Sequence, residues 1–341
     1  MYNTRTHTNC NCLQDNKHDI KNLITLVNIN QLFSPLTQET SYNNSDTMAD
    51  SDELFSLHQD FFTGNFESVS KTGLDEYSAE SKPYALSYKI RSLLKLGQGS
   101  SVLPLIQSSS FSQDEKFTQA FTEYVKFYQT GSESPILENL IANSKEQWYV
   151  QQVGSLYLVA LNHTEEAIKL LHNHTNSLES VLYLISLYIA SGRLDLAEKE
   201  LNVAANYSQD SIIYNIAEAL VNSVKNGEQL RGVLYFYEEL GHQYPSLTTK
   251  LGHFIINLQL KQFEEAEVTL AELQEMGVSS DADLISNEIT LASLKGDQAK
   301  VDELREQLAS INPDHKLLVD YQEKIQLFGE ISEKYASHIQ A

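Results

Sequence analysis

The sequence predicts an all-α fold made of about eight helical hairpins, an α-solenoid, followed by a C-terminal capping helix. Only 6 prolines and 14 glycines punctuate the 341 residues, which suits helices joined by short turns. Apolar residues recur at helical spacing through most of the chain. A small or apolar residue also opens each expected second helix at intervals of 30 to 36 residues, close to the period of helix–turn–helix repeats. These marker residues are Val69, Val102, Leu137, Ala167, Ala197, Val233, Ala266 and Val301.

The clearest hairpin lies within residues 181–205, which read as two short helices broken at Gly192. Glycine reaches the left-handed conformation of a helix C-terminus without a Cβ clash, so the first helix ends there with one apolar face buried. In the second helix, Ala197 lets two antiparallel helices approach closely. Asp195 lies near the N-terminus of this helix, where the helix dipole stabilises a negative charge. It is also spaced to pair with Lys199 four residues later. The spacing resembles a tetratricopeptide (TPR) unit.

The register of the whole array follows from a few small residues. Gly64 and Gly192 mark turns, and the alanines mark close helix crossings in the second helices of three hairpins, Ala167, Ala197 and Ala266.

Three segments differ from a regular repeat. The third hairpin, residues 114–143, is weak because residues 131–135 form an atypical turn, and the sixth carries extra residues at 225–228. The last helix, about 314–335, is expected to cap the final repeat through one apolar face. That face comprises Leu317, Leu318, Tyr321, Ile325 and Phe328.

The first 47 residues differ in composition from the chain that follows. They are rich in Asn and Thr and contain only 3 Lys plus Arg and 4 Asp plus Glu. We therefore expect residues 1–47 to be a disordered or non-native extension with the working start at Met48, and residues 48–341 to form the solenoid.

The charge balance excludes several classes of protein. With 24 Lys plus Arg against 46 Asp plus Glu, the formal net charge is −22, which argues against binding of nucleic acid or unaided docking on anionic membrane. No stretch of about twenty apolar residues occurs. The two cysteines, Cys10 and Cys12, fit a reducing compartment rather than a disulfide-built domain.

Candidate chemistry is weak throughout. The glycine-rich turn at residues 97–101 lacks the lysine of a phosphate-binding loop. His172 and His174 stand at i and i+2 of a helix and point apart, so they favour no shared ion even with His163 nearby.

Two further groups of residues lack the features of a functional site. His7 with Cys10 and Cys12 lacks a fourth metal ligand. The acidic pairs at 165–166, 238–239 and 264–265 recur at one repeat position, where the helix dipole explains them. We predict no catalytic, cofactor-binding or metal-binding residue.

A partner is instead expected on the concave surface that first helices present in such arrays, where amphipathic rings are effective contacts. The candidate partner-binding residues are Tyr124, Tyr128, Leu182, Ser186, Leu251 and Ile255.

An ordered set of motifs resembles the epsilon subunit family of coatomer over about residues 50–338. Residues 52–55 with 61–66 are similar to its N-terminal signature, and residues 191–201 to its most recognisable internal repeat. Residues 226–240 and 262–266 are similar to later hairpins. Residues 1–47 have no counterpart in that family.

The resemblance implies a non-enzymatic subunit of the COPI vesicle coat, cytoplasmic and peripheral on Golgi membranes and COPI-coated vesicles. It implies a role in retrograde transport to the endoplasmic reticulum. It further implies that the array holds and stabilises the C-terminal region of the alpha coatomer subunit, and reaches the membrane only through the rest of the coat.

Two other function classes stay open. A generic TPR adaptor or co-chaperone would clamp a peptide in the concave groove, but a clamp for acidic tails needs cations on first helices, and the hairpin from Val181 has none before Arg193. An enzyme scaffolded on helical repeats would need a nucleophile and base that do not stand out in the sequence.

Overall fold

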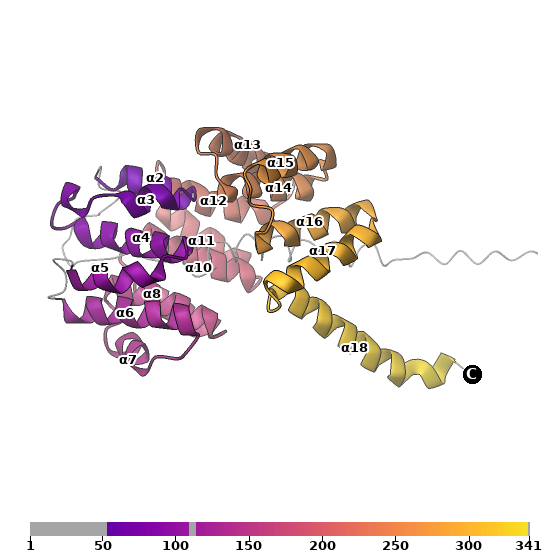
Figure 1. The fold of residues 1–341 in the computed structure, drawn as a ribbon, viewed down its shortest axis with the longest axis horizontal. Coiled ribbons are helices and arrows are strands. Elements are labelled where there is room, and N and C mark those ends of the chain that lie inside the picture. Colours follow the sequence, from indigo (N-terminus) through magenta and orange to yellow (C-terminus); the bar gives the residue numbers. More distant parts are fainter. Residues whose placement is uncertain (1–52, 109–113, 340–341) are drawn as a thin grey trace, which may run out of the picture. The chain divides into compact units, whose positions relative to one another are not determined.

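The computed structural model describes residues 53–108 and 114–339, and the regular structure of these residues is helical throughout (Figure 1). Sixteen of its α-helices form eight consecutive hairpins and a seventeenth closes the chain, so the predicted fold class is confirmed. The extension at residues 1–47, the start at Met48 and the His7–Cys10–Cys12 group lie outside the described residues.

The hairpins follow one another along the chain with short connections. Two short 3₁₀ turns, η1 (Leu74–Glu76) and η2 (Gly99–Ser101), lie between α3 and α4 and between α4 and α5. The helices are α2 (Phe55–Phe62), α3 (Phe66–Lys71), α4 (Lys82–Lys95), α5 (Val102–Ser108), α6 (Glu115–Thr130), α7 (Pro135–Asn143), α8 (Trp148–Ala160), α9 (Thr164–Leu171), α10 (Leu178–Ala190), α11 (Leu194–Ala204), α12 (Ile212–Val224), α13 (Glu228–Gln243), α14 (Leu247–Leu260), α15 (Phe263–Glu275), α16 (Ala282–Lys295), α17 (Gln298–Ile311) and α18 (Lys316–Ile339).

The described chain divides into two compact units. We call the described residues from 53 to 252 the N-terminal unit and those from 253 to 339 the C-terminal unit; the division falls within α14. Each unit has its own buried contacts and is described separately.

The eight marker residues occupy equivalent places. Each lies in the second helix of its hairpin, and all eight are buried. Ala167, Ala197 and Ala266 expose no surface, while Gly64 and Gly192 adopt φ values of +86° and +71°, in the left-handed region that glycine allows. The near-constant spacing in the sequence therefore corresponds to a repeated close crossing of two helices.

The third hairpin is as regular as its neighbours. Asp114 caps α6 by accepting a hydrogen bond from the Phe117 amide (3.0 Å), and Gly131 ends that helix at φ +67°. Ser134 then caps α7, with Pro135 at its first position. The atypical turn at residues 131–135 therefore consists of the C-cap of α6 followed directly by the N-cap of α7.

Helix α10 is buried on all sides rather than on one face. All twelve residues from Leu178 to Ile189 are buried. The reason is its place inside the N-terminal unit, where it packs against α9, α11 and α12 and its Glu179 meets α4. The apolar spacing within α10 predicted one buried face, but it did not indicate that the opposite face would also be covered.

The expected pairing of Asp195 with Lys199 is replaced by another. Asp195 accepts two hydrogen bonds from the Arg193 guanidinium, each at 2.9 Å. A planar guanidinium matches both carboxylate oxygens at once, which a lysine ammonium cannot do.

Helix α18 caps the last hairpin through its start alone. Leu317 and Leu318 pack on the core of α16 and α17, but Tyr321, Ile325 and Phe328 of the predicted apolar face are exposed. The prediction of a cap is correct for the first turn and wrong for the rest of that face.

Ala197→Trp should lower the free energy of unfolding by about 1–3 kcal/mol or more, because the site is fully buried at a close helix crossing. Val203→Trp is the matched control, since Val203 lies on the same helix and is half exposed. Urea unfolding of both variants measures the difference. Equal stability of the two would contradict the assigned crossing.

Candidate functional site

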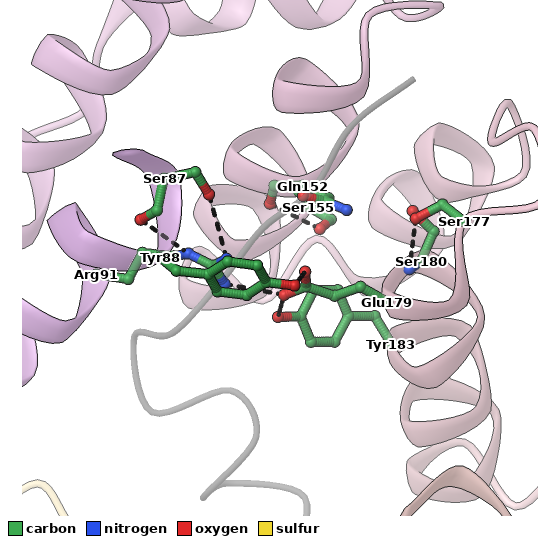
Figure 2. Close-up of polar contacts among 9 residues, drawn as sticks. All are labelled: Ser87, Tyr88, Arg91, Gln152, Ser155, Ser177, Glu179, Ser180 and Tyr183. Carbon is green, nitrogen blue, oxygen red and sulfur yellow. Dashed lines mark hydrogen bonds and ion pairs between the residues drawn. The ribbon is translucent and has the colours of Figure 1, made fainter. Parts of the chain in front are cut away.

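A group of buried polar side chains lies inside the N-terminal unit (Figure 2). It draws on three first helices, α4, α8 and α10, which come from the second, fourth and fifth hairpins. We call it the inner polar cluster; it comprises Ser87, Tyr88, Arg91, Gln152, Ser155, Ser177, Glu179, Ser180 and Tyr183.

An ion pair stands at its centre. The Arg91 Nη1 donates to Glu179 Oε1 at 2.9 Å, and the two side chains are 1% and 2% exposed. The same carboxylate accepts from the Tyr183 hydroxyl at 2.6 Å and from the Tyr88 hydroxyl at 3.2 Å. A buried carboxylate is tolerated only with such compensation.

The guanidinium is held from its other sides as well. Its Nε donates to the Ser87 carbonyl and its Nη2 to the Ser87 hydroxyl, both at 3.2 Å. The Arg91 Cζ lies 4.4 Å from the ring centre of Phe61 and 4.2 Å from that of Tyr88. Arg91 thereby links α2, α4 and α10, which are distant in the sequence.

The first hairpin also meets the end of the N-terminal unit. Helix α2 packs against α12, and the Ser246 hydroxyl donates to the Thr63 carbonyl. A Cβ on Gly64 would collide with the Thr248 side chain, so glycine is needed there for close approach as well as for its positive φ. The hairpins of this unit therefore close back on themselves.

Gln152 is the unusual member of the cluster. Its side chain is fully buried, yet neither Nε2 nor Oε1 has a hydrogen-bond partner within the described chain. The Ser180 hydroxyl, also buried, is unbonded in the same way. Leaving a buried donor or acceptor unpaired costs about 1–3 kcal/mol per group, so these atoms favour the arrival of a polar ligand or partner.

The predicted concave-face residues occupy mainly core positions. Tyr124, Leu182, Ser186, Leu251 and Ile255 are buried, and the Ser186 hydroxyl donates to the Leu182 carbonyl at 2.7 Å. Tyr128 is half-buried, and burial raises the pKa of its hydroxyl, which lies 3.4 Å from the Leu94 carbonyl. Their packing role is visible, and their contact with a partner stays a prediction.

Sequence reasoning missed the central pair. Arg91 is a cation within the buried part of α4, and Glu179 is an acid at the start of the apolar run of α10. A lone charge at a buried position of a helix was the available signal, because it requires an opposite charge elsewhere in the fold. Nothing local indicated that the two positions, 88 residues apart, would meet.

His172 has a structural partner, and His174 is largely buried. His172 Nε2 lies 2.5 Å from the Tyr188 hydroxyl. Burial, with a smaller effect of the nearby His172 charge, lowers the pKa of His174 from 6.5 to about 4. Within residues 53–108 and 114–339, no three His, Cys, Asp or Glu side chains gather in a way that could hold a metal ion. The described helices also include none whose length and apolarity would let it cross a bilayer.

Comparison with known proteins gives a consistent result. The family model of the coatomer epsilon subunit matches residues 50–336. The coatomer subunit epsilon of Saccharomyces cerevisiae is 26% identical over 304 residues, covering 83% of this chain and 98% of the yeast protein. The Caenorhabditis elegans protein of the same name is 22% identical over 82% of this chain and 98% of its own length. Coatomer subunit epsilon-2 of Oryza sativa subsp. japonica is 27% identical over 79% and 93%.

Glu179→Ala should cost about 3–5 kcal/mol of unfolding free energy, because it leaves the Arg91 guanidinium buried without its carboxylate. Replacing both partners, Arg91→Met with Glu179→Leu, should recover most of that loss. Asp195→Ala, which breaks the exposed pair with Arg193, is the control and should change little. Similar losses in Glu179→Ala and Asp195→Ala would mean that the buried pair is not a main support.

His174 should make stability pH-dependent. A histidine pKa of about 4 in the folded chain, below the usual 6.5, contributes stability that is complete above pH 6.5 and lost as pH falls towards 4. The loss amounts to about 3 kcal/mol at the acid end. In denaturant unfolding between pH 7 and 4.5, His174→Phe should show a shallower decline than the unmodified chain. Parallel curves would contradict the depressed pKa.

Proposed function

Because this chain belongs to the coatomer epsilon subunit family, we propose that it is a non-enzymatic, structural subunit of the COPI coat. In this role it binds and stabilises the C-terminal region of the alpha coatomer subunit during transport from the Golgi back to the endoplasmic reticulum. The family match over residues 50–336 is the observation that carries the proposal. The chain would be cytoplasmic and peripheral on Golgi membranes and coated vesicles, with the coat making the membrane contact.

The interior of the N-terminal unit is the surface we assign to that partner. It offers a fully buried carboxamide with both a donor and an acceptor unused, on Gln152, and it also holds the unbonded hydroxyl of Ser180. One carboxamide can bond a peptide N–H and a peptide C=O together, so the site suits the main chain of an inserted segment.

Entry of a partner segment requires the closed hairpins to separate. The contact of α2 with α12 and the hydrogen bond from Ser246 to the Thr63 carbonyl are the described contacts that would open. Once inside, the segment would reach the first-helix side chains of this unit that are predicted for partner contact, Tyr124, Tyr128, Leu182, Ser186 and Leu251.

The co-chaperone alternative is less well supported by the site. A clamp for an acidic tail needs an inner cation able to bind the tail carboxylates. Arg91, the cation of the inner polar cluster, is already bonded to Glu179 and stacked on two rings. The interior is therefore better suited to a neutral polar main chain.

Gln152→Leu should separate stability from binding. Removing an unbonded buried carboxamide should leave the free chain as stable or more stable, while affinity for the alpha C-terminal region falls about five- to thirtyfold. Calorimetric titration of the purified full chain with that region measures the affinity. Gln229→Leu on the exposed side of α13 is the matched control.

Two outcomes would contradict the proposal at different levels. Unchanged affinity in Gln152→Leu would remove the assigned surface and leave the partner in place. Affinity purification of the unmodified chain that recovers no coatomer subunit would end the proposed function.

A further inference from the structure

The outstanding unexplained surface of the C-terminal unit is the apolar side of α18. Fourteen large hydrophobic side chains are exposed in the described residues, and seven of them lie on this one helix. Phe328 is the extreme case at 74% exposure. The seven are Val319, Tyr321, Ile325, Leu327, Phe328, Ile331 and Tyr335. Single exposed apolar residues are ordinary, but such a concentration on one element marks an interaction surface.

The anchoring of α18 is confined to its start. Leu317 and Leu318 pack on the core of α16 and α17, and the Arg305 guanidinium lies 3.9 Å from the ring centre of Tyr321. The helix then runs on to Ile339 beyond α17 (Figure 1). Ile325 and Phe328 lie in this projecting part.

The spacing of the apolar residues suits a helical partner. Leu318, Tyr321, Ile325 and Phe328 alternate at intervals of three and four, the spacing of a seam that packs against a second helix. Leu318 and Tyr321 meet the chain's own α16 and α17, and Ile325 and Phe328 continue the seam beyond that contact. Tyr335, seven residues after Phe328, extends the same seam by two further turns.

The flank of this seam is acidic. A groove of ≈ 820 Å³ runs between α17 and α18, and its lining includes Asp302, Glu306 and Glu323. Arg305 also lines it, but its charge is directed to Asp302 at 3.4 Å and to the ring of Tyr321. The groove therefore complements a partner that carries lysine or arginine beside its apolar face.

We propose that α17 and α18 form a docking surface for a basic amphipathic helix of another coat subunit. The partner's apolar side chains cover Ile325 and Phe328, and its cations lie beside Glu306 and Glu323. This inference rests on the proposed function, because a subunit of a multisubunit coat is assembled with other subunits that can cover the surface. An anionic membrane is disfavoured by the acidic flank, and a second copy would place like charges together.

The test uses the full chain with a photo-crosslinking phenylalanine derivative at position 328, mixed with the purified remaining coatomer subunits. We expect a crosslink to a helical segment of one coat subunit that is rich in lysine or arginine. A crosslink between two copies of this chain, a crosslink to an acidic or non-helical segment, or no crosslink would overturn the proposal. Flotation of the isolated chain with anionic phospholipid vesicles would overturn it as well.

Affinity measurements supply the second arm. Ile325→Asp with Phe328→Asp should weaken binding to the crosslinked subunit about thirtyfold or more, since apolar contacts at an interface centre dominate its energy. Val268→Asp removes an equally exposed apolar side chain on α15 and should bind as the unmodified chain does. Glu306→Gln with Glu323→Gln should weaken binding moderately and make it less sensitive to salt. Equal affinities for all variants would contradict the surface.

The two levels of failure are distinguishable. If the unmodified chain recovers no coat subunit, the proposed function fails. If the unmodified chain and the Ile325→Asp, Phe328→Asp variant recover the whole coat equally, only the α18 surface fails. Circular dichroism should show the same helix content for all variants, because the substituted residues are exposed.

Discussion

The N-terminal unit depends on one buried ion pair. Arg91 and Glu179 lie in the second and fifth hairpins, and a stack of hairpins that contacted only its neighbours would keep them apart. Their 2.9 Å contact requires the intervening hairpins to curve until α4 and α10 face each other. The cost of burying both charges is offset by two tyrosine hydroxyls, Ser87 and two aromatic rings. Such a pair selects one curvature among many similar packings.

The curvature of the N-terminal unit explains why its first helices are more buried than those of an open array. Helix α10 is covered on every side, and the inner face carries bonded polar groups instead of solvent-exposed ones. Within this interior, the Gln152 carboxamide and the Ser180 hydroxyl are buried without a bond. The contrast with α18 in the C-terminal unit is chemical: the interior offers polar groups for a main chain, whereas α18 offers apolar side chains bordered by acids. Two kinds of contact suit a subunit of a larger assembly.

The sequence predicted the elements well where the signals are local. The signals at Ala167, Ala197 and Gly192 depend on neighbours within about ten residues. Their structural roles can therefore be predicted from the local sequence. The third hairpin shows the limit of a repeat template: its caps at Asp114 and Ser134 are regular, although residues 131–135 depart from the turn that the template expects. The site was much less predictable. The concave-face prediction rests on repeat position alone, and most of those residues lie in the core.

By itself, the sequence determined the helical class, the hairpin register and the family, since periodicity, caps and ordered motifs are properties of short segments. Tertiary structure alone decided which first helices face each other, that Arg91 meets Glu179, that Gln152 is left unbonded, and that α18 exposes the face expected to cap. Each of these depends on contacts between residues far apart in the chain. A helical pattern in the sequence indicates that one face of a helix is apolar. Only the assembled fold determines which residues, if any, cover that face.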